Sequence, residues 1–252
     1  KMAALSALGL ASGLPYVLAN DTLTAWLSSL DIDVKRIGLF SLVTLPYTFK
    51  FLWAPAMDRW AVFGRTLGRR RGWLLLTQAL LAVGLAGIAA TGPTAAGQSL
   101  TMLSVLATIL VFLSASQDVV ADAYRADVVD EQELGAGAAV FVSGYRIAMI
   151  LGGAASLLLA DRLGWRAAYA VMAVLMGSAC IVTLFAPEPA RATASPHSLA
   201  DAVVQPFANF AKRHGTRALL VLTFVVVFRL PDLLGNRMTM PLLLQELHYS
   251  KA

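Results

Sequence analysis

Two carboxylates, Asp118 and Asp122, are the residues of this sequence whose types and spacing best suit chemistry within an apolar segment. They are four residues apart, so on a helix they share one face. Apolar runs precede and follow them, and ionisable groups in such a setting usually face a bundle interior or a wet cavity. We therefore predict that they take up protons or bind a polar ligand. The alternative is that they form structural ion pairs with Arg125 or Arg146.

Three cations also fall inside otherwise apolar segments and could bind an anion: Lys50, Arg146 and Arg229. Lys50 stands in the middle of LPYTFKFLWAP, several apolar residues from either end. The alternative is that the aliphatic part of the Lys50 side chain lies along apolar surface while its ammonium group reaches the membrane interface. We favour instead a cation that faces a cavity.

Composition defines the elements that must position these residues. Of the 252 residues, 58% are hydrophobic and only 14% are charged, with a mean hydropathy of +0.69. Soluble domains carry about 25% charged residues, so the chain is predicted to be a polytopic, all-α membrane protein. A membrane span needs about 20 apolar residues. This criterion predicts seven spans: 4–30, 37–57, 73–92, 100–124, 136–160, 166–186 and 217–245.

Basic residues set the predicted orientation. With the N-terminus inside, eleven Lys and Arg residues fall in inside loops and five in outside loops, which favours a cytoplasmic N-terminus. This clustering at segment ends argues against a nucleic-acid partner. We predict a six-span half over 1–187, a linker with an amphipathic helix over 188–215, and the first span of a second half over 216–252.

The loop DRWAVFGRTLGRRRG resembles the signature of the loop between spans 2 and 3 of major facilitator transporters, in a spaced form. Asp58 is not needed for topology, so we expect it to gate, by capping a helix end or by pairing with a basic residue. The alternative is a plain basic loop that obeys the positive-inside rule. The predicted gating residues are Asp58, Arg59, Arg69, Arg70, Arg71, Arg125 and Arg237.

A weak internal repeat links the first and last predicted spans. GLPYVLANDTLTAWL from Gly13 and RLPDLLGNRMTMPLL from Arg229 share five positions at an offset of 216. Parallel repeats of this kind relate the two halves of a major facilitator transporter. The offset aligns Asp21 with Arg237, and we predict that they meet when the outer side closes. Local pairing of each charge is the alternative.

Several stretches together resemble the AmpG-type muropeptide permeases, which are bacterial major facilitator proteins. They include GLASGLPYVLANDTLTAWL, SASQDVVADAYRADV and ELGAGAAVFVSGYR, and the resemblance runs from about residue 8 to about residue 190. It implies an N-terminal six-helix bundle plus helix 7, an incomplete chain, in the bacterial inner membrane. It further implies proton-coupled import of GlcNAc-anhydroMurNAc, with or without peptide, for cell-wall recycling. The last span is also similar to the acetyl-CoA transporter branch, so another anionic metabolite is the alternative substrate.

For such a transporter we assign proton coupling to Asp118, Asp122 and Asp21, and substrate contact to Lys50, Tyr47, Gln117, Tyr145, Arg146 and Arg229. The expected partners are protons, the lipid bilayer and a small anionic substrate, and we expect a monomer. One cysteine and three scattered histidines predict no metal, no cofactor and no enzyme site. Two other functions are alternatives to transport. A membrane-embedded enzyme would need a nucleophile with a base or a metal site, and no such set of residues is visible in the sequence. A receptor or scaffold that transports nothing would not need Asp118, Asp122, Lys50 and Arg146 inside its helices.

Overall fold

The computed structural model describes residues 1–30, 41–63, 67–92, 98–189, 208–215, 217–225 and 227–228. The chain forms two compact units, Lys1–Pro196 and His197–Ala252. Every regular element in the described residues is a helix, which confirms the predicted all-α class. The finer division at residues 187 and 215 stays a prediction.

Five helical segments in the described residues are long and apolar enough to cross a membrane, so this is a multi-pass membrane protein. They match five of the seven predicted spans to within a few residues at each end. Two of them contain a π-helical turn. The segments are α1 (Met2–Val17), a π turn (Leu18–Thr22) and α2 (Leu23–Ser28); α6 (Arg69–Thr91); α7 (Gln98–Val128); α8 (Leu134–Ile150), a π turn (Leu151–Ala155) and α9 (Ser156–Leu163); and α10 (Trp165–Phe185).

The predicted span over 37–57 is wrong as a single helix in its described part. Residues 41–59 form two 3₁₀ turns and two short helices, α4 (Leu45–Phe49) and α5 (Ala54–Arg59). Each short helix has a proline in its first turn, Pro46 or Pro55. Proline lacks the N–H that would continue a preceding helix and clashes with the turn before it, so the segment restarts at each one.

The last predicted span, 217–245, lies only partly within the described residues. Residues 217–225 and 227–228 are helical, and so are 208–214 in the predicted linker. Arg229 and Arg237 lie outside the described residues, so their assignments remain predictions.

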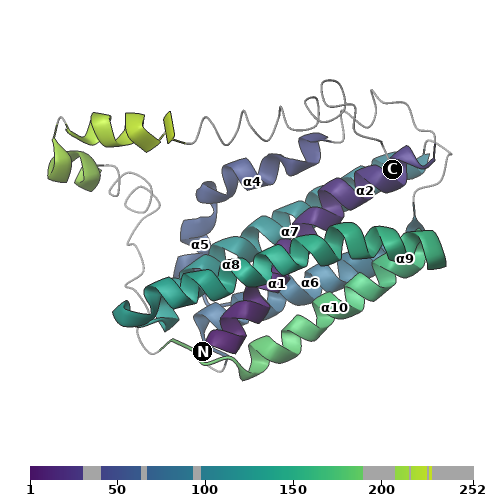
Figure 1. Cartoon of the computed structure of the whole chain (residues 1–252), viewed down its shortest axis with the longest axis horizontal. Helices are drawn as coiled ribbons and strands as arrows, with labels where there is room; N and C mark the ends of the chain where they lie inside the picture. Colours follow the sequence, from purple (N-terminus) through teal and green to yellow (C-terminus); the bar gives the residue numbers. More distant parts are fainter. Residues whose placement is uncertain are drawn as a thin grey trace, which may run out of the picture. The chain divides into compact units, whose positions relative to one another are not determined.

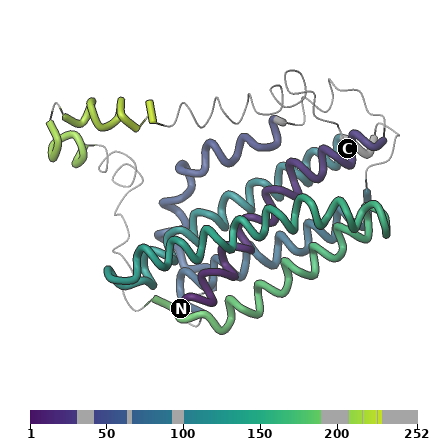
Figure 2. Tube along the Cα trace, in the orientation of Figure 1, coloured from purple at the N-terminus to yellow at the C-terminus, as the bar shows by residue number. Residues whose placement is uncertain are grey.

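In the first unit the long helices run side by side along one direction (Figures 1 and 2). Helix α1 packs against α7, α8 and α10, while α6 packs against α7 and α10. The apolar window of the first segment is 61% buried, against 22% for Glu131–Leu163. The first segment is therefore the centre of the bundle.

Glycine lets α1 and α8 approach closely. A Cβ placed on Gly9 would lie 2.1 Å from the Phe141 carbonyl oxygen, and one on Gly144 would lie 2.1 Å from the Ser6 carbonyl oxygen. Both would clash with backbone, so no larger residue fits. The sequence has a small residue at every fourth position from Gly144 to Ala160, a pattern that lets a neighbouring helix approach closely, and all five of these residues are buried.

Candidate functional site

A cluster of partly buried polar side chains lies where the α4–α5 segment packs against α7. The Lys50 Nζ is 3.7 Å from the Asp118 Oδ2, and their side chains are 34% and 15% exposed. Asp118 lies in the second half of the candidate span Thr101–Val128, ten residues, or about 15 Å along the axis, before its end. Lys50 begins the 3₁₀ turn between α4 and α5. The break in this segment therefore positions the cation that faces Asp118.

Aromatic and hydroxyl groups surround this pair. The Lys50 Nζ lies 5.7 Å from the centre of the Tyr47 ring, within cation–π range. The Tyr47 hydroxyl is 2.7 Å from the Ser114 hydroxyl, and the Tyr47 ring meets the Tyr16 ring edge to face at 4.8 Å. We call Tyr16, Tyr47, Lys50, Ser114 and Asp118 the central cluster. It combines one cation, one carboxylate and two phenols, a set that can bind an anionic, hydroxyl-rich molecule.

Asp122 shares the helix face of Asp118 but has a different partner. Its Oδ1 lies 3.2 Å from the Arg125 Nη2, and its side chain is 51% exposed. The Arg125 guanidinium also lies 5.0 Å from the centre of the Phe141 ring. The ion pair that the sequence suggested as an alternative is thus present for Asp122, whereas Asp118 faces Lys50.

Three other predicted substrate residues lie in different settings. Arg146 on α8 is exposed and forms no ion pair with the residues that the structure describes, and its neighbour Tyr145 is partly buried. The Gln117 side chain is fully buried, so it does not contact a substrate in this conformation. Its amide nitrogen and oxygen both lack hydrogen-bond partners in the described part of the chain.

The two π turns meet each other and hold Asp21 at the edge of the bundle. Thr22 donates a hydrogen bond to the Gly152 carbonyl at 2.5 Å, and Tyr169 donates to the Leu18 carbonyl at 2.7 Å. Asp21 is exposed and accepts a hydrogen bond from Asn20 at 2.6 Å. π turns often occur at functional sites, because the extra residue redirects side chains and loosens the helix.

A second charged group lies where α5, α6 and α7 end or begin. The Arg70 guanidinium bonds to the Asp58 carboxylate and, through its Nε, to the Asp127 Oδ2 at 2.9 Å. The side chain of Arg70 is 6% exposed and that of Asp127 is 9% exposed. The predicted pairing of Asp58 with a basic residue is confirmed, while its gating role stays a prediction.

Glu188, just beyond α10, completes this group, although no sequence motif assigned it a role. Its two carboxylate oxygens each accept a hydrogen bond of 3.1 Å from a backbone N–H at the start of α6, those of Arg70 and Arg71. Arg71 in turn donates to the Leu184 carbonyl. A carboxylate at a helix N-terminus is favourable because it meets unpaired N–H groups and the positive end of the dipole. The sequence feature that could have identified Glu188 is an acidic residue between two prolines, in a chain where another helix begins with three arginines.

We call Asp58, Arg70, Arg71, Asp127 and Glu188 the helix-end network. It ties α5, α6, α7 and the end of α10 together. Of the other predicted gating residues, Arg59 is exposed and Arg69 is partly buried.

Comparison with known proteins identifies the architecture. The sequence model of the family described as Major Facilitator Superfamily matches residues 2–252. The chain belongs to the Major Facilitator Superfamily. It is 45% identical over 246 residues to the anhydromuropeptide permease of Escherichia coli, covering 97% of this chain and 49% of that protein. It is also 36% identical over 232 residues to an uncharacterized protein of Haemophilus influenzae, covering 89% of this chain and 52% of that protein.

The chain thus spans about half the length of these curated relatives. Halves of major facilitator proteins are related by an axis along the membrane normal and enclose the site between them. The division of this chain into a six-span N-terminal half and the start of a second half stays a prediction.

Proposed function

We propose that this protein imports anhydro-muropeptides across the bacterial inner membrane, driven by the proton gradient, for the recycling of cell-wall material. The observation that carries the proposal is the Lys50–Asp118 pair, in which Asp118 lies within a membrane span, among Tyr16, Tyr47 and Ser114. Membership of the superfamily and 45% identity to an anhydromuropeptide permease support it.

The mechanism follows from competition for Lys50. An anionic group of the substrate that approaches Lys50 weakens the attraction between Lys50 and Asp118. A carboxylate that loses its cation in a poorly hydrated site is disfavoured in its charged form, so Asp118 then accepts a proton. Substrate and proton therefore bind together, which couples the two fluxes. Asp122 and Asp21 are more exposed and would deliver protons to Asp118 or to the outer side.

The clustering of basic residues in alternate loops supports a cytoplasmic N-terminus. The two halves rock about the central cluster in alternating access. The protein acts as a monomer and releases its substrate chemically unchanged, as a transporter and not an enzyme does.

The test is uptake of radiolabelled GlcNAc-anhydroMurNAc tripeptide by liposomes that contain the purified protein. We expect accumulation when the outside is acidic, loss of it with a protonophore, and recovery of the intact compound from the lumen. Unlabelled acetyl-CoA is the competitor that probes the alternative substrate. Equal uptake with and without a gradient would contradict the coupling, and strong competition by acetyl-CoA would contradict the substrate.

A further inference from the structure

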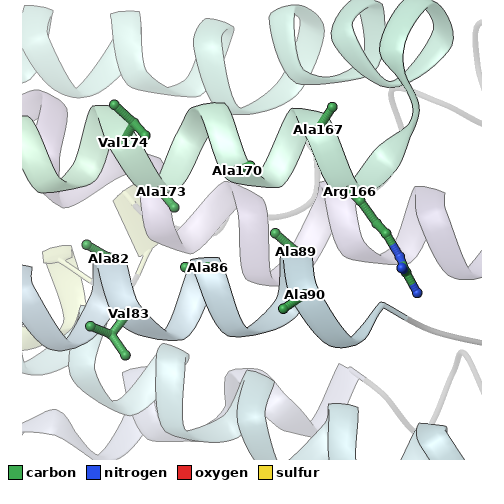
Figure 3. Close-up of a pocket in the computed structure, with 10 residues that line it drawn as sticks. All are labelled: Ala82, Val83, Ala86, Ala89, Ala90, Arg166, Ala167, Ala170, Ala173 and Val174. Atoms are coloured by element: carbon green, nitrogen blue, oxygen red, sulfur yellow. The ribbon is translucent and has the colours of Figure 1, made fainter.

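A groove of about 730 Å³ lies between α6 and α10, outside the central cluster (Figure 3). Seven of its ten lining residues are alanines, and Val83 and Val174 flank it. The lining comes from the second half of α6, Ala82–Ala90, and from the first half of α10, Arg166–Val174. Alanine side chains leave space that larger residues would fill, which is why two closely packed helices enclose a groove here.

The groove faces away from the proposed transport site. Figure 1 shows α10 and the α4–α5 segment, which carries Lys50, on opposite sides of the bundle. Val83 and Val174 are 69% and 74% exposed, although both are apolar. Between Trp73 and Ala90 and between Ala167 and Phe185 the two helices carry no charged residue. In a membrane-spanning bundle such a surface faces lipid chains.

One cation, Arg166, closes the groove at its end (Figure 3). It is the second residue of α10, so it lies where the span begins, at the depth of lipid headgroups. Its Nη2 donates one long hydrogen bond, 3.4 Å, to the Thr91 carbonyl at the end of α6. Within the described ranges Arg166 forms no ion pair with an acidic side chain. A guanidinium has five N–H donors, so most of them remain for a ligand.

The length of the groove matches one leaflet of the bilayer. From Arg166 to Val174 the helix rises about 12 Å, close to half of the roughly 30 Å hydrocarbon core. We propose that this groove binds one anionic phospholipid, with the phosphate on Arg166 and one acyl chain along the alanines. The charge selects the headgroup, because Arg binds phosphate through paired N–H groups. The small alanine side chains leave room for the acyl chain.

The test is native mass spectrometry of the purified protein in mild detergent, titrated with phosphatidylglycerol and, in parallel, with phosphatidylcholine. We expect one tightly retained phosphatidylglycerol and about tenfold weaker binding in Arg166→Ala, as expected for the loss of a charge-assisted contact. Arg162→Ala is the matched control, since Arg162 is also an exposed arginine at this end of the bundle but does not line the groove. It should retain the lipid.

A second variant tests the groove apart from the charge. Ala170→Phe fills the space at an exposed lining position and leaves Arg166 in place, so it should also lose the lipid while helix content by circular dichroism is unchanged. Equal retention by Arg166→Ala and the wild type would overturn the proposal. So would equal affinity for phosphatidylcholine, or a protein dimer that Ala170→Phe dissociates, because a second copy would then occupy the groove.

Discussion

The central cluster and the helix-end network both hold a cation against a carboxylate, yet their geometry differs. Arg70 contacts two carboxylates, one through an N–O distance of 2.9 Å, and its side chain is 6% exposed. Lys50 faces one carboxylate at 3.7 Å, beyond ordinary hydrogen-bond distance, and is 34% exposed. A closed, multiply bonded group resists exchange of partners, whereas a loose, partly open pair can exchange its partner for a substrate or a proton. The first arrangement suits a structural joint and the second suits a binding site.

The largest expected effect is in the central cluster, on transport. Asp118→Asn keeps the size of the side chain but cannot release a proton, so proton-driven accumulation should fall to the level of empty liposomes. Uptake in the liposome assay measures this, with Asp161→Asn as the control because Asp161 is an exposed carboxylate at the end of α9. Normal accumulation by a correctly inserted Asp118→Asn protein would remove the proposed difference between the two regions.

The next effect is in the helix-end network, on stability. Arg70→Met leaves Asp58 and Asp127 without their shared cation, and removal of one partner from a buried ion pair costs about 3–5 kcal/mol. Thermal unfolding in detergent should show a Tm lower by about 10 °C. Arg59→Met, at an exposed position on the same side, should change Tm by no more than about 2 °C. Equal Tm values for the two variants would show that the network is not a joint.

Glu188→Gln should have a smaller effect on stability than Arg70→Met. The amide keeps one acceptor oxygen but loses the second bond and the negative charge at the start of α6, a loss of about 1 kcal/mol. The Tm should fall by about 3 °C, and Glu131→Gln, an exposed acid, is the control. A decrease as large as that of Arg70→Met would place the centre of the network at Glu188.

The smallest effect is expected at Asp122. Its partner Arg125 is three residues away on the same helix, and both side chains of this ion pair are partly exposed. Asp122→Asn should therefore change the free energy of unfolding by less than about 0.5 kcal/mol. Uptake should fall less than in Asp118→Asn. Complete loss of uptake in Asp122→Asn would instead make the two carboxylates a functional unit.

The sequence alone determined the class of this protein and the five described spans, because hydropathy and length are local properties that a bilayer selects directly. It also determined the close packing around Gly144, since small residues at every fourth position can only serve a neighbouring helix. Asp58 was singled out as a charge without a topological purpose, and the structure gives it a basic partner.

Only the tertiary structure decided which charges meet. Asp118 and Asp122 are equivalent by spacing, but the break between α4 and α5 brings Lys50 to one of them alone. Glu188 reaches α6 from a segment more than 100 residues away. Pairing across such separations depends on how helices are placed against one another. That placement is set by the packing of whole faces and is not encoded in the spacing along any single segment.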